Sequence, residues 1–162
     1  MQDTTNTRPP IGYTLRDLQR LQLPPLEHVL YGLPRGCYGM VNATTDAGKS
    51  TLFRNLALSA ASGRQFPPLF TGTRPLRVAI LDFEDPTVAM RSDLATMLCS
   101  LPPEAQEAVQ DRLYIATEIV TADDELLTLN ERTEFRRVVA ELKEFAPDLV
   151  LVDTLSSAFI LE

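Results

Sequence analysis

Two patterns of apolar and polar positions alternate along the 162-residue chain. Short apolar runs of strand length lie at residues 38–42, 76–84, 113–117 and 148–153. Between these runs, apolar residues recur at helical spacing over residues 48–62, 85–99, 102–112 and 130–145. Strands that alternate with helices predict an α/β fold with a mostly parallel, doubly wound sheet. Such sheets bind ligands at the carboxyl ends of their strands, so candidate chemistry is sought there.

Residue types that favour helix ends mark the predicted boundaries. Thr14 and Asp17 form a capping box that opens a short helix before the Pro24–Pro25 pair. The other boundary residues are Gly63 as the C-terminal cap of the 48–62 helix, Asp85 as cap and Pro86 as first residue of the next, and Asn130 and Pro147 at the ends of the last. The last helix has an apolar stripe, predicted to cover the sheet, at Phe135, Val138, Val139, Leu142 and Phe145. The run at 148–153 is almost continuously apolar, which is typical of a strand buried on both faces.

Composition narrows the class of protein. Hydrophobic residues make up 44% and charged residues 23%, as in globular proteins, so we expect one domain over residues 13–162 after a flexible tail at residues 1–12. The 15 Lys and Arg residues against 22 Asp and Glu give a net charge of −7, which argues against coating nucleic acid by bulk charge. No apolar run approaches the about 18 residues of a membrane span, and the polar start is not a signal peptide. We therefore expect a cytoplasmic protein without a membrane partner.

The run ATTDAGKST, residues 43–51, links a predicted strand directly to a predicted helix. Unpaired N–H groups at such a helix start can surround phosphate oxygens. Gly48 lets the backbone approach closely, Lys49 places a positive charge on the β- and γ-phosphates, and Ser50 can coordinate Mg²⁺. The predicted nucleotide-binding residues are Ala43, Thr44, Thr45, Asp46, Ala47, Gly48, Lys49, Ser50 and Thr51. The alternative is a solvated lysine and serine at an ordinary helix start.

Two residues depart from a glycine-rich phosphate loop. Ala43 stands where such loops have a glycine, and alanine fits there if its φ stays negative. Asp46 lies inside the loop, where a carboxylate repels phosphates unless it points to solvent. We expect the loop tip to let it do so.

Carboxylates follow two of the predicted strands. Asp153 ends the 148–153 run, which is a Walker B arrangement in which the aspartate holds Mg²⁺; alternatively it is a turn residue. Asp82, Glu84 and Asp85 end the 76–84 run. We assign Asp85 to the helix cap and expect Glu84 to orient or deprotonate an attacking water. Alternatively, Asp82 and Glu84 are solvated turn residues.

With these motifs at this spacing, the chain resembles the RecA-like P-loop ATPases, and most closely the RepA-type hexameric replicative helicases. The similarity runs through LEHVLYGLPRGCYGMVNA, GKSTLFRNLALSAASGRQFPPLFTGTRPLRVAILDFEDP and DLVLVDTLSSAF. It implies a RecA-like ATP-binding domain with ATP and Mg²⁺ as cofactors. By the same resemblance, Glu84 and Lys49 are the catalytic residues, and Ser50 and Asp153 hold the metal. Further implications are a homo-oligomer, hexameric in the family, and DNA bound through regions absent from this chain.

The chain stops at Glu162, whereas members of this family continue with another strand that lies between the P-loop strand and the Walker B strand. Either the chain is the N-terminal part of a longer protein, which we expect, or these two strands pair directly. In the first case the ATPase core is incomplete at its C-terminus.

Three functions are consistent with the sequence. The leading hypothesis is a Mg²⁺-dependent ATPase, the core of a RepA-like DNA helicase or a related DNA-handling ATPase. The second is a P-loop kinase, which usually has several arginines in a lid after the P-loop. Only Arg64 and Arg74 lie between Ser62 and Leu76, which argues against a kinase. The third is a non-hydrolysing ATP-binding assembly module.

Overall fold

A three-stranded parallel sheet forms the centre of the protein. The computed structural model describes residues 12–23, 25–44, 46–72, 74–117, 129 and 132–158. Strand β3 (Val78–Asp82) lies in the middle and pairs with β4 (Leu113–Thr117) on one side and β5 (Leu149–Asp153) on the other. In this register Asp82 lies beside both Thr117 and Asp153. The three strands therefore end together at one edge, called here the carboxyl rim.

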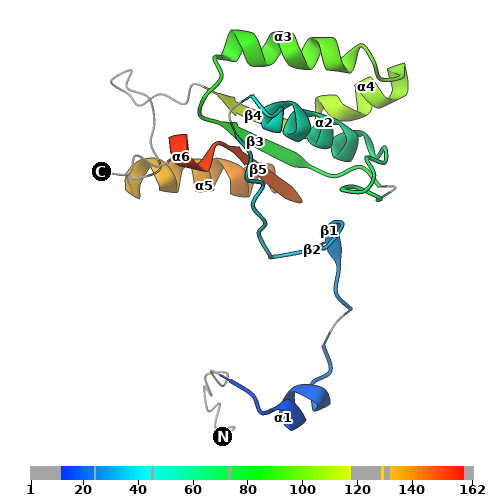
Figure 1. Ribbon diagram of the computed structural model, residues 1–162, viewed down its shortest axis with the longest axis vertical. Helices are drawn as coiled ribbons and strands as arrows, with labels where there is room; N and C mark the ends of the chain where they lie inside the picture. The colour runs from blue at the N-terminus through cyan, green and yellow to red at the C-terminus, as the bar shows by residue number, and fades with distance from the viewer. Residues whose placement is uncertain are drawn as a thin grey trace, which may run out of the picture.

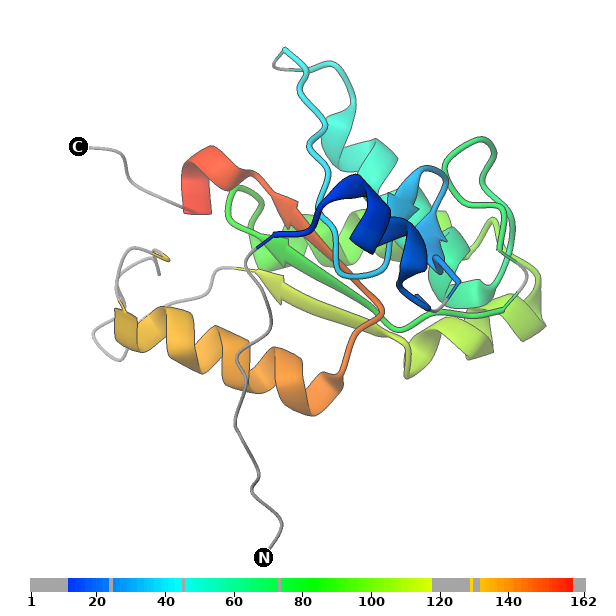
Figure 2. The same cartoon turned by 90° about the horizontal axis from the view of Figure 1, so that it is seen from below.

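Helices cover both faces of this sheet, as the alternation along the sequence predicts (Figures 1 and 2). On one face lie α2 (Lys49–Ser62), α3 (Thr87–Leu98) and α4 (Pro103–Gln110), and on the other lies α5 (Arg132–Phe145). The short α6 (Leu155–Ala158) follows β5. This mixed α/β architecture is compatible with a P-loop nucleotide-binding fold.

The core divides between the two faces because side chains alternate along β3. Val78 and Ile80 pack with α2, α3 and α4 in the larger cluster, which includes Leu56, Met90 and Val109. Leu81 points the other way and packs with Val138 of α5. Within the predicted stripe of α5, Val138 is buried but Phe135 is 47% exposed, so the stripe covers the sheet only in part.

Helix α1 (Leu15–Arg20) of the N-terminal segment stands apart from these layers. It begins at the predicted capping box, where the Asp17 N–H donates to Thr14 Oγ1 at 3.2 Å, and none of its residues is buried (Figure 1). It is followed by a two-stranded antiparallel hairpin of β1 (His28–Leu30) and β2 (Leu33–Pro34), which the sequence pattern did not indicate. Residues 1–11, which hold almost all of the predicted tail, lie outside the described residues.

The predicted strand at residues 38–42 is wrong. This segment has no strand pairing, and Tyr38, Met40 and Val41 are 95%, 76% and 46% exposed. A strand needs a neighbour for its backbone hydrogen bonds, and the nearest candidate, β5, pairs only with β3 among the described residues. Direct pairing of the P-loop segment with the Walker B strand, one of the two arrangements expected above, is therefore not formed.

The burial of β5 also differs from the prediction that both of its faces are buried. Leu149 and Leu151 are buried in the larger core, but Val150 on the opposite face is 40% exposed. The strand is thus covered on one face along its whole length and on the other only near its carboxyl end, where Val152 joins the α5 cluster.

Helix boundaries follow the predicted signals with one exception. Gly63 caps α2 in the left-handed conformation, with φ of 74°, and α5 ends two residues before Pro147. The assignment of Asp85 and Pro86 is wrong, because Pro86 itself is the cap residue of α3 and no side chain caps that helix. Asp85 instead forms an ion pair with Arg54 of α2. Asn130 lies outside the described residues.

Candidate nucleotide-binding site

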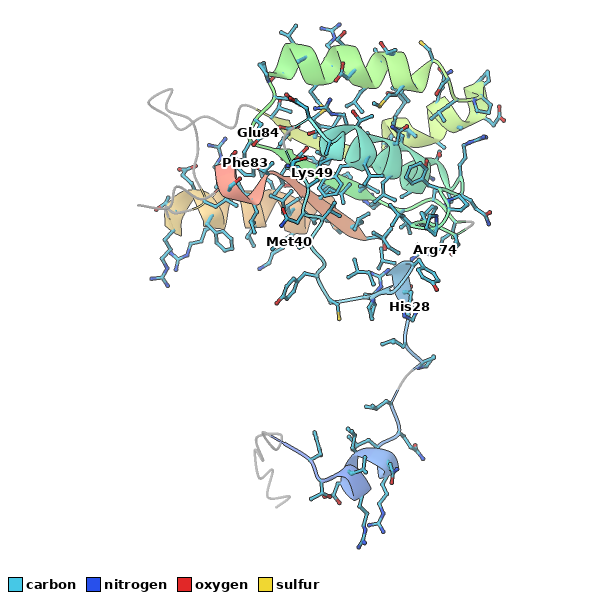
Figure 3. All side chains as sticks on the ribbon, in the orientation of Figure 1. His28, Met40, Lys49, Arg74, Phe83 and Glu84 are labelled. Carbon is cyan, nitrogen blue, oxygen red and sulfur yellow. The ribbon has the colours of Figure 1, made fainter. Side chains whose placement is uncertain are left out.

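The carboxyl rim brings the predicted acidic residues to one edge of the sheet. Because β3 and β5 are parallel and in register, Asp82 and Asp153 end side by side. The Phe83 N–H donates to the Asp153 carbonyl at 2.7 Å and extends this pairing into the turn that holds Glu84. Figure 3 shows Lys49 and Glu84 near each other at this end, whereas His28 and Arg74 lie at the other. The predicted catalytic pair therefore belongs to the edge where parallel sheets bind ligands.

The loop that leads into α2 contains two described residues with left-handed backbone. Gly48 precedes the helix in the left-handed region, with φ of 80°, a conformation that side chains disfavour. Asp46 is also left-handed, with φ of 61°, and its side chain is exposed, as expected for the loop tip. Ala43 is not among the described residues with positive φ, so alanine fits there without strain. Thr45 lies outside the described residues.

A cavity of about 600 Å³ opens between this loop and the carboxyl rim. All of the described nucleotide-binding residues predicted from the sequence line it, and so does Glu84. Three further lining residues, Asp85, Thr154 and Ser156, come from the two strand ends. The lining is mostly polar, which suits a highly charged ligand better than an apolar one. The structure thus assembles the loop and the glutamate around one space.

Asp153 meets Lys49 at this site. The Lys49 Nζ lies 3.7 Å from Asp153 Oδ1, and Asp153 is only 3% exposed. Its Oδ1 is buried without a hydrogen-bond partner among the described residues. A buried carboxylate oxygen without a hydrogen bond is costly, so this atom is able to accept a further contact besides that of Lys49. A metal ion or a bound water would satisfy it.

Glu84 is held by hydroxyl groups that follow β5. Its Oε1 accepts hydrogen bonds from Thr154 Oγ1 at 2.8 Å and from Ser157 Oγ at 2.9 Å. These bonds, the Thr154 bond first, together with the charge of Lys49, lower the pKa of Glu84 against a weaker opposing effect of burial. Glu84 is therefore an anion at neutral pH, and its Oε2 takes no hydrogen bond from the described residues.

Asp82 is a buried residue rather than the solvated turn residue considered above. It is 1% exposed, and its Oδ1 accepts the N–H groups of Glu84 at 3.0 Å and of Asp85 at 2.8 Å. Burial raises the pKa of Asp82, and the two N–H groups oppose that rise. Its Oδ2 faces Arg54 Nη2 at 3.5 Å. Asp82 therefore fixes the backbone of the turn that presents Glu84.

Two groups of residues at this site were not predicted from the sequence. The hydroxyls of Thr154, Ser156 and Ser157 directly follow Asp153, and their signal was a run of hydroxyl residues beginning at a strand end. Arg54 was missed because charged residues are normally placed on the exposed face of a helix. Its spacing of four from Leu58 and seven from Ala61, both buried, put it on the inner face.

The residues present fit a magnesium ion bound together with a polyphosphate. No group of three or more His, Cys, Asp or Glu side chains suited to a metal was found among the described residues. Magnesium, however, takes one or two protein ligands and completes its shell with phosphate oxygens and water. Ser50 lines the cavity, and Asp153 supplies a buried oxygen without a partner. This donor set is therefore suited to magnesium brought in with a nucleotide.

None of the helices in the described part of the chain is long and apolar enough to cross a membrane.

Comparison with known proteins agrees with this geometry. A search of curated proteins finds no match. The model of a family described as AAA domain matches residues 5–161, almost the whole chain. The loop, the cavity and this match lead to one conclusion: the chain belongs to the AAA domain family of P-loop ATPases.

Proposed function

We propose that the protein is a Mg²⁺-dependent ATPase that binds ATP in the cavity at the carboxyl rim. The observation that supports this most directly is Asp153 Oδ1, which is buried without a partner 3.7 Å from the Lys49 ammonium. At this distance the two groups form an ion pair but no hydrogen bond, which leaves Oδ1 able to contact a cation as well. The pair is placed to receive a cation and a polyanion together.

Lys49 and the loop bind the triphosphate in this proposal. The N–H groups around Gly48 and the Lys49 ammonium contact phosphate oxygens and stabilise the charge that develops as the γ-phosphoryl group transfers. Ser50 and Asp153 hold Mg²⁺, which neutralises phosphate charge when bound. Asp46 lines the same cavity, but its side chain is exposed, so solvent screens the repulsion between its charge and the phosphates.

Glu84 orients the attacking water. Its Oε1 is occupied by two hydroxyl donors, so Oε2 is the atom available to accept a hydrogen bond from a water molecule. The lowered pKa keeps the carboxylate ionised at neutral pH, which suits an acceptor that positions water. As the water oxygen bonds to the γ-phosphorus, the bond from that phosphorus to the bridging oxygen breaks and ADP leaves, while the proton of the water passes to Glu84 or to solvent.

The finer assignment is to the RepA-like, DNA-handling ATPases. It is supported by the order and spacing of the P-loop, the Glu84 turn and the strand that ends at Asp153, not by any DNA contact within the described residues. In this proposal the protein acts as a homo-oligomer, with a hexamer as the expected form, and hydrolysis drives movement on DNA. Sedimentation with ATP tests the assembly, because a particle of about six chains supports it and a monomer contradicts it.

Substitution of Lys49 tests the ATPase proposal. The chain has two lysines, and the second, Lys143, is exposed on α5 far from the cavity, so Lys143→Ala is a matched control for Lys49→Ala. Titration of a fluorescent ATP analogue in the presence of Mg²⁺ should show tight binding for the wild type and the control. Lys49→Ala should weaken binding at least tenfold, because a charge-assisted contact to phosphate is lost. Equal affinities for all three proteins would rule out the P-loop reading.

A further inference from the structure

Arg54 is a buried charge on α2 with acidic partners on three other segments. Its side chain is 6% exposed, and its guanidinium pairs with Asp82 at the end of β3, Asp85 in the next turn and Asp93 on α3. The partners lie 28 to 39 residues away along the chain. The proposed function above gives this cluster no role.

The guanidinium divides its contacts between two parts of the molecule. Nη1 donates to Asp93 Oδ2 at 2.5 Å, while Nη2 faces Asp82 Oδ2 at 3.5 Å and also contacts Asp85. One edge of the planar group thus reaches α3, and the other reaches the turn after β3. Lysine could not reproduce this arrangement, because its ammonium is a single point of charge.

Through Asp82, this cluster contacts the backbone of Glu84. Asp82 uses Oδ2 for Arg54 and Oδ1 for the N–H groups of Glu84 and Asp85. Arg54 itself lies five residues after Lys49 in the same helix, so it moves with the phosphate-binding residues. A continuous chain of contacts therefore joins the start of α2 to the backbone of Glu84.

We propose that Arg54 is a positioning residue for ATP hydrolysis, which sets the place of Glu84 relative to Lys49 and uses Asp93 as its anchor on α3. This inference rests on the proposed ATPase function and deepens it. Arg54 does not line the cavity, so it acts through Asp82 and the turn.

The charges of the cluster are poorly explained by stability alone. Three carboxylates face one guanidinium, which leaves excess negative charge beside a cavity suited to phosphates. In addition, Arg54 Nε is buried without a hydrogen-bond partner among the described residues. Buried ion pairs of this kind contribute little to stability compared with apolar packing. The contacts from Arg54 to Asp82, and from Asp82 to the backbone, do fix the geometry of the turn that holds Glu84.

The test uses two mild substitutions. Arg54→Lys keeps the charge but not the divided contacts, and Asp93→Asn removes only the charge of the anchor, at a half-exposed site that tolerates change. Asp111→Asn, at an exposed position with no ion pair among the described residues, is the control for Asp93→Asn. At saturating ATP, Arg54→Lys should lower kcat by about 10- to 100-fold, because a displacement of about 1 Å has effects of this size. Asp93→Asn should lower it less, and the affinity for an ATP analogue should change less than about threefold in either variant.

A double-mutant cycle separates positioning from general stabilisation. In a Glu84→Gln background, Arg54→Lys should have no further effect on turnover, since the group that it positions is already inactive. An equal loss of turnover in both backgrounds would overturn the inference. So would an unchanged kcat for Arg54→Lys in a folded protein.

Amide hydrogen exchange provides a measure that does not depend on hydrolysis. The Glu84 and Asp85 N–H groups should lose protection in Arg54→Lys while amides of the central strand β3 keep theirs. If the wild type binds no ATP, the proposed function fails and the catalytic role of Arg54 fails with it. If the wild type is active and both the exchange and kcat of Arg54→Lys match it, only the present inference is overturned.

Discussion

An aspartate lies at each end of β5, but the two differ in how fully their oxygens are hydrogen-bonded. Asp148 immediately precedes the strand, and both of its oxygens have partners: Arg35 Nη2 lies 2.9 Å from Oδ1, and the Arg77 N–H donates to Oδ2 at 3.0 Å. Arg74 adds a third contact at 3.6 Å. Asp153 ends the strand, is more deeply buried, and has an Oδ1 without a hydrogen bond.

This difference distinguishes an end whose aspartate stabilises the fold from the end at which we propose that ATP binds. At the amino end of the strands, Asp148 joins the hairpin, through Arg35, to the start of β3, and the same Arg35 also pairs with Glu27. Every charge in that group has an opposite charge beside it. At the carboxyl end, Asp153 Oδ1 has no hydrogen bond, and Glu84, which lines the cavity, has an Oε2 that accepts none from the described residues. Buried polar atoms are normally satisfied, so the exceptions point to the functional end.

Glu84→Gln should produce the largest effect and tests whether the carboxyl rim is catalytic. Turnover should fall about 10²-fold or more, while the affinity for ATP should be nearly unchanged, because glutamine keeps the shape but loses the charge that orients water. Steady-state phosphate release and analogue binding measure the two quantities. A variant with wild-type turnover would show that hydrolysis does not depend on the charge of Glu84.

Exchanging aspartate for asparagine at each end of β5 tests the comparison itself. Asp148→Asn should reduce the free energy of unfolding, because the ion pair with Arg35 is lost and the bond from the Arg77 backbone N–H is weakened, and should leave ATP affinity unchanged. Asp153→Asn should do the reverse: it removes a buried carboxylate charge whose Oδ1 has no hydrogen bond and contacts Lys49 only at 3.7 Å, so stability should change little, but Mg²⁺–ATP affinity should fall. Urea unfolding and analogue titration of both variants measure the two effects. A stability loss in Asp153→Asn equal to that in Asp148→Asn would contradict the proposed difference between the two ends.

Glycines at the two ends of α2 provide a smaller test. Gly48 and Gly63 both have positive φ, so alanine at either position should cost about 1–2 kcal/mol of stability from backbone strain. Gly63→Ala should cost more, because its new Cβ would lie 3.0 Å from the Pro75 nitrogen, whereas a Cβ at Gly48 meets nothing within 4 Å. Only Gly48→Ala should reduce ATP affinity. Thermal unfolding with and without ATP compares them, and an equal effect of ATP on both variants would speak against the loop as the binding site.

The pH dependence of stability should show the smallest effect, with opposite signs for two aspartates. Burial acts to raise the pKa of Asp148, but Arg35 and the Arg77 N–H outweigh it, so this pKa is lowered on folding and its stabilisation is lost as pH falls through the folded value. The pKa of Asp82 is raised by burial, so its contribution is lost as pH rises. Between about pH 3 and pH 6, Asp148→Asn should therefore flatten the rise of stability with pH, and Asp82→Asn should steepen it. Urea unfolding at several pH values measures both slopes, and slopes that change in the same direction would contradict the assignment.

The sequence by itself determined much of this protein. Apolar periodicity identified β3, β4, β5 and the helices α2 to α5, because local spacing decides which face of an element can be buried. The run around Lys49 and the strand ends at Glu84 and Asp153 predicted that these residues lie at one edge of the sheet, since parallel strands in register bring their ends together. Capping signals such as Thr14 and Gly63 also held, because they depend only on neighbouring residues.

Only the tertiary structure decided the rest. Residues 38–42 have the composition of a strand but no neighbour to pair with, and pairing is a property of the sheet rather than of the segment. Aspartate is a residue type that favours helix caps, yet Asp85 pairs with Arg54, which is distant along the chain. The burial of Asp153 Oδ1 without a hydrogen bond, and the hydrogen bonds from hydroxyls to Glu84, likewise depend on contacts between distant segments. Such contacts follow from packing in three dimensions, which local patterns do not contain.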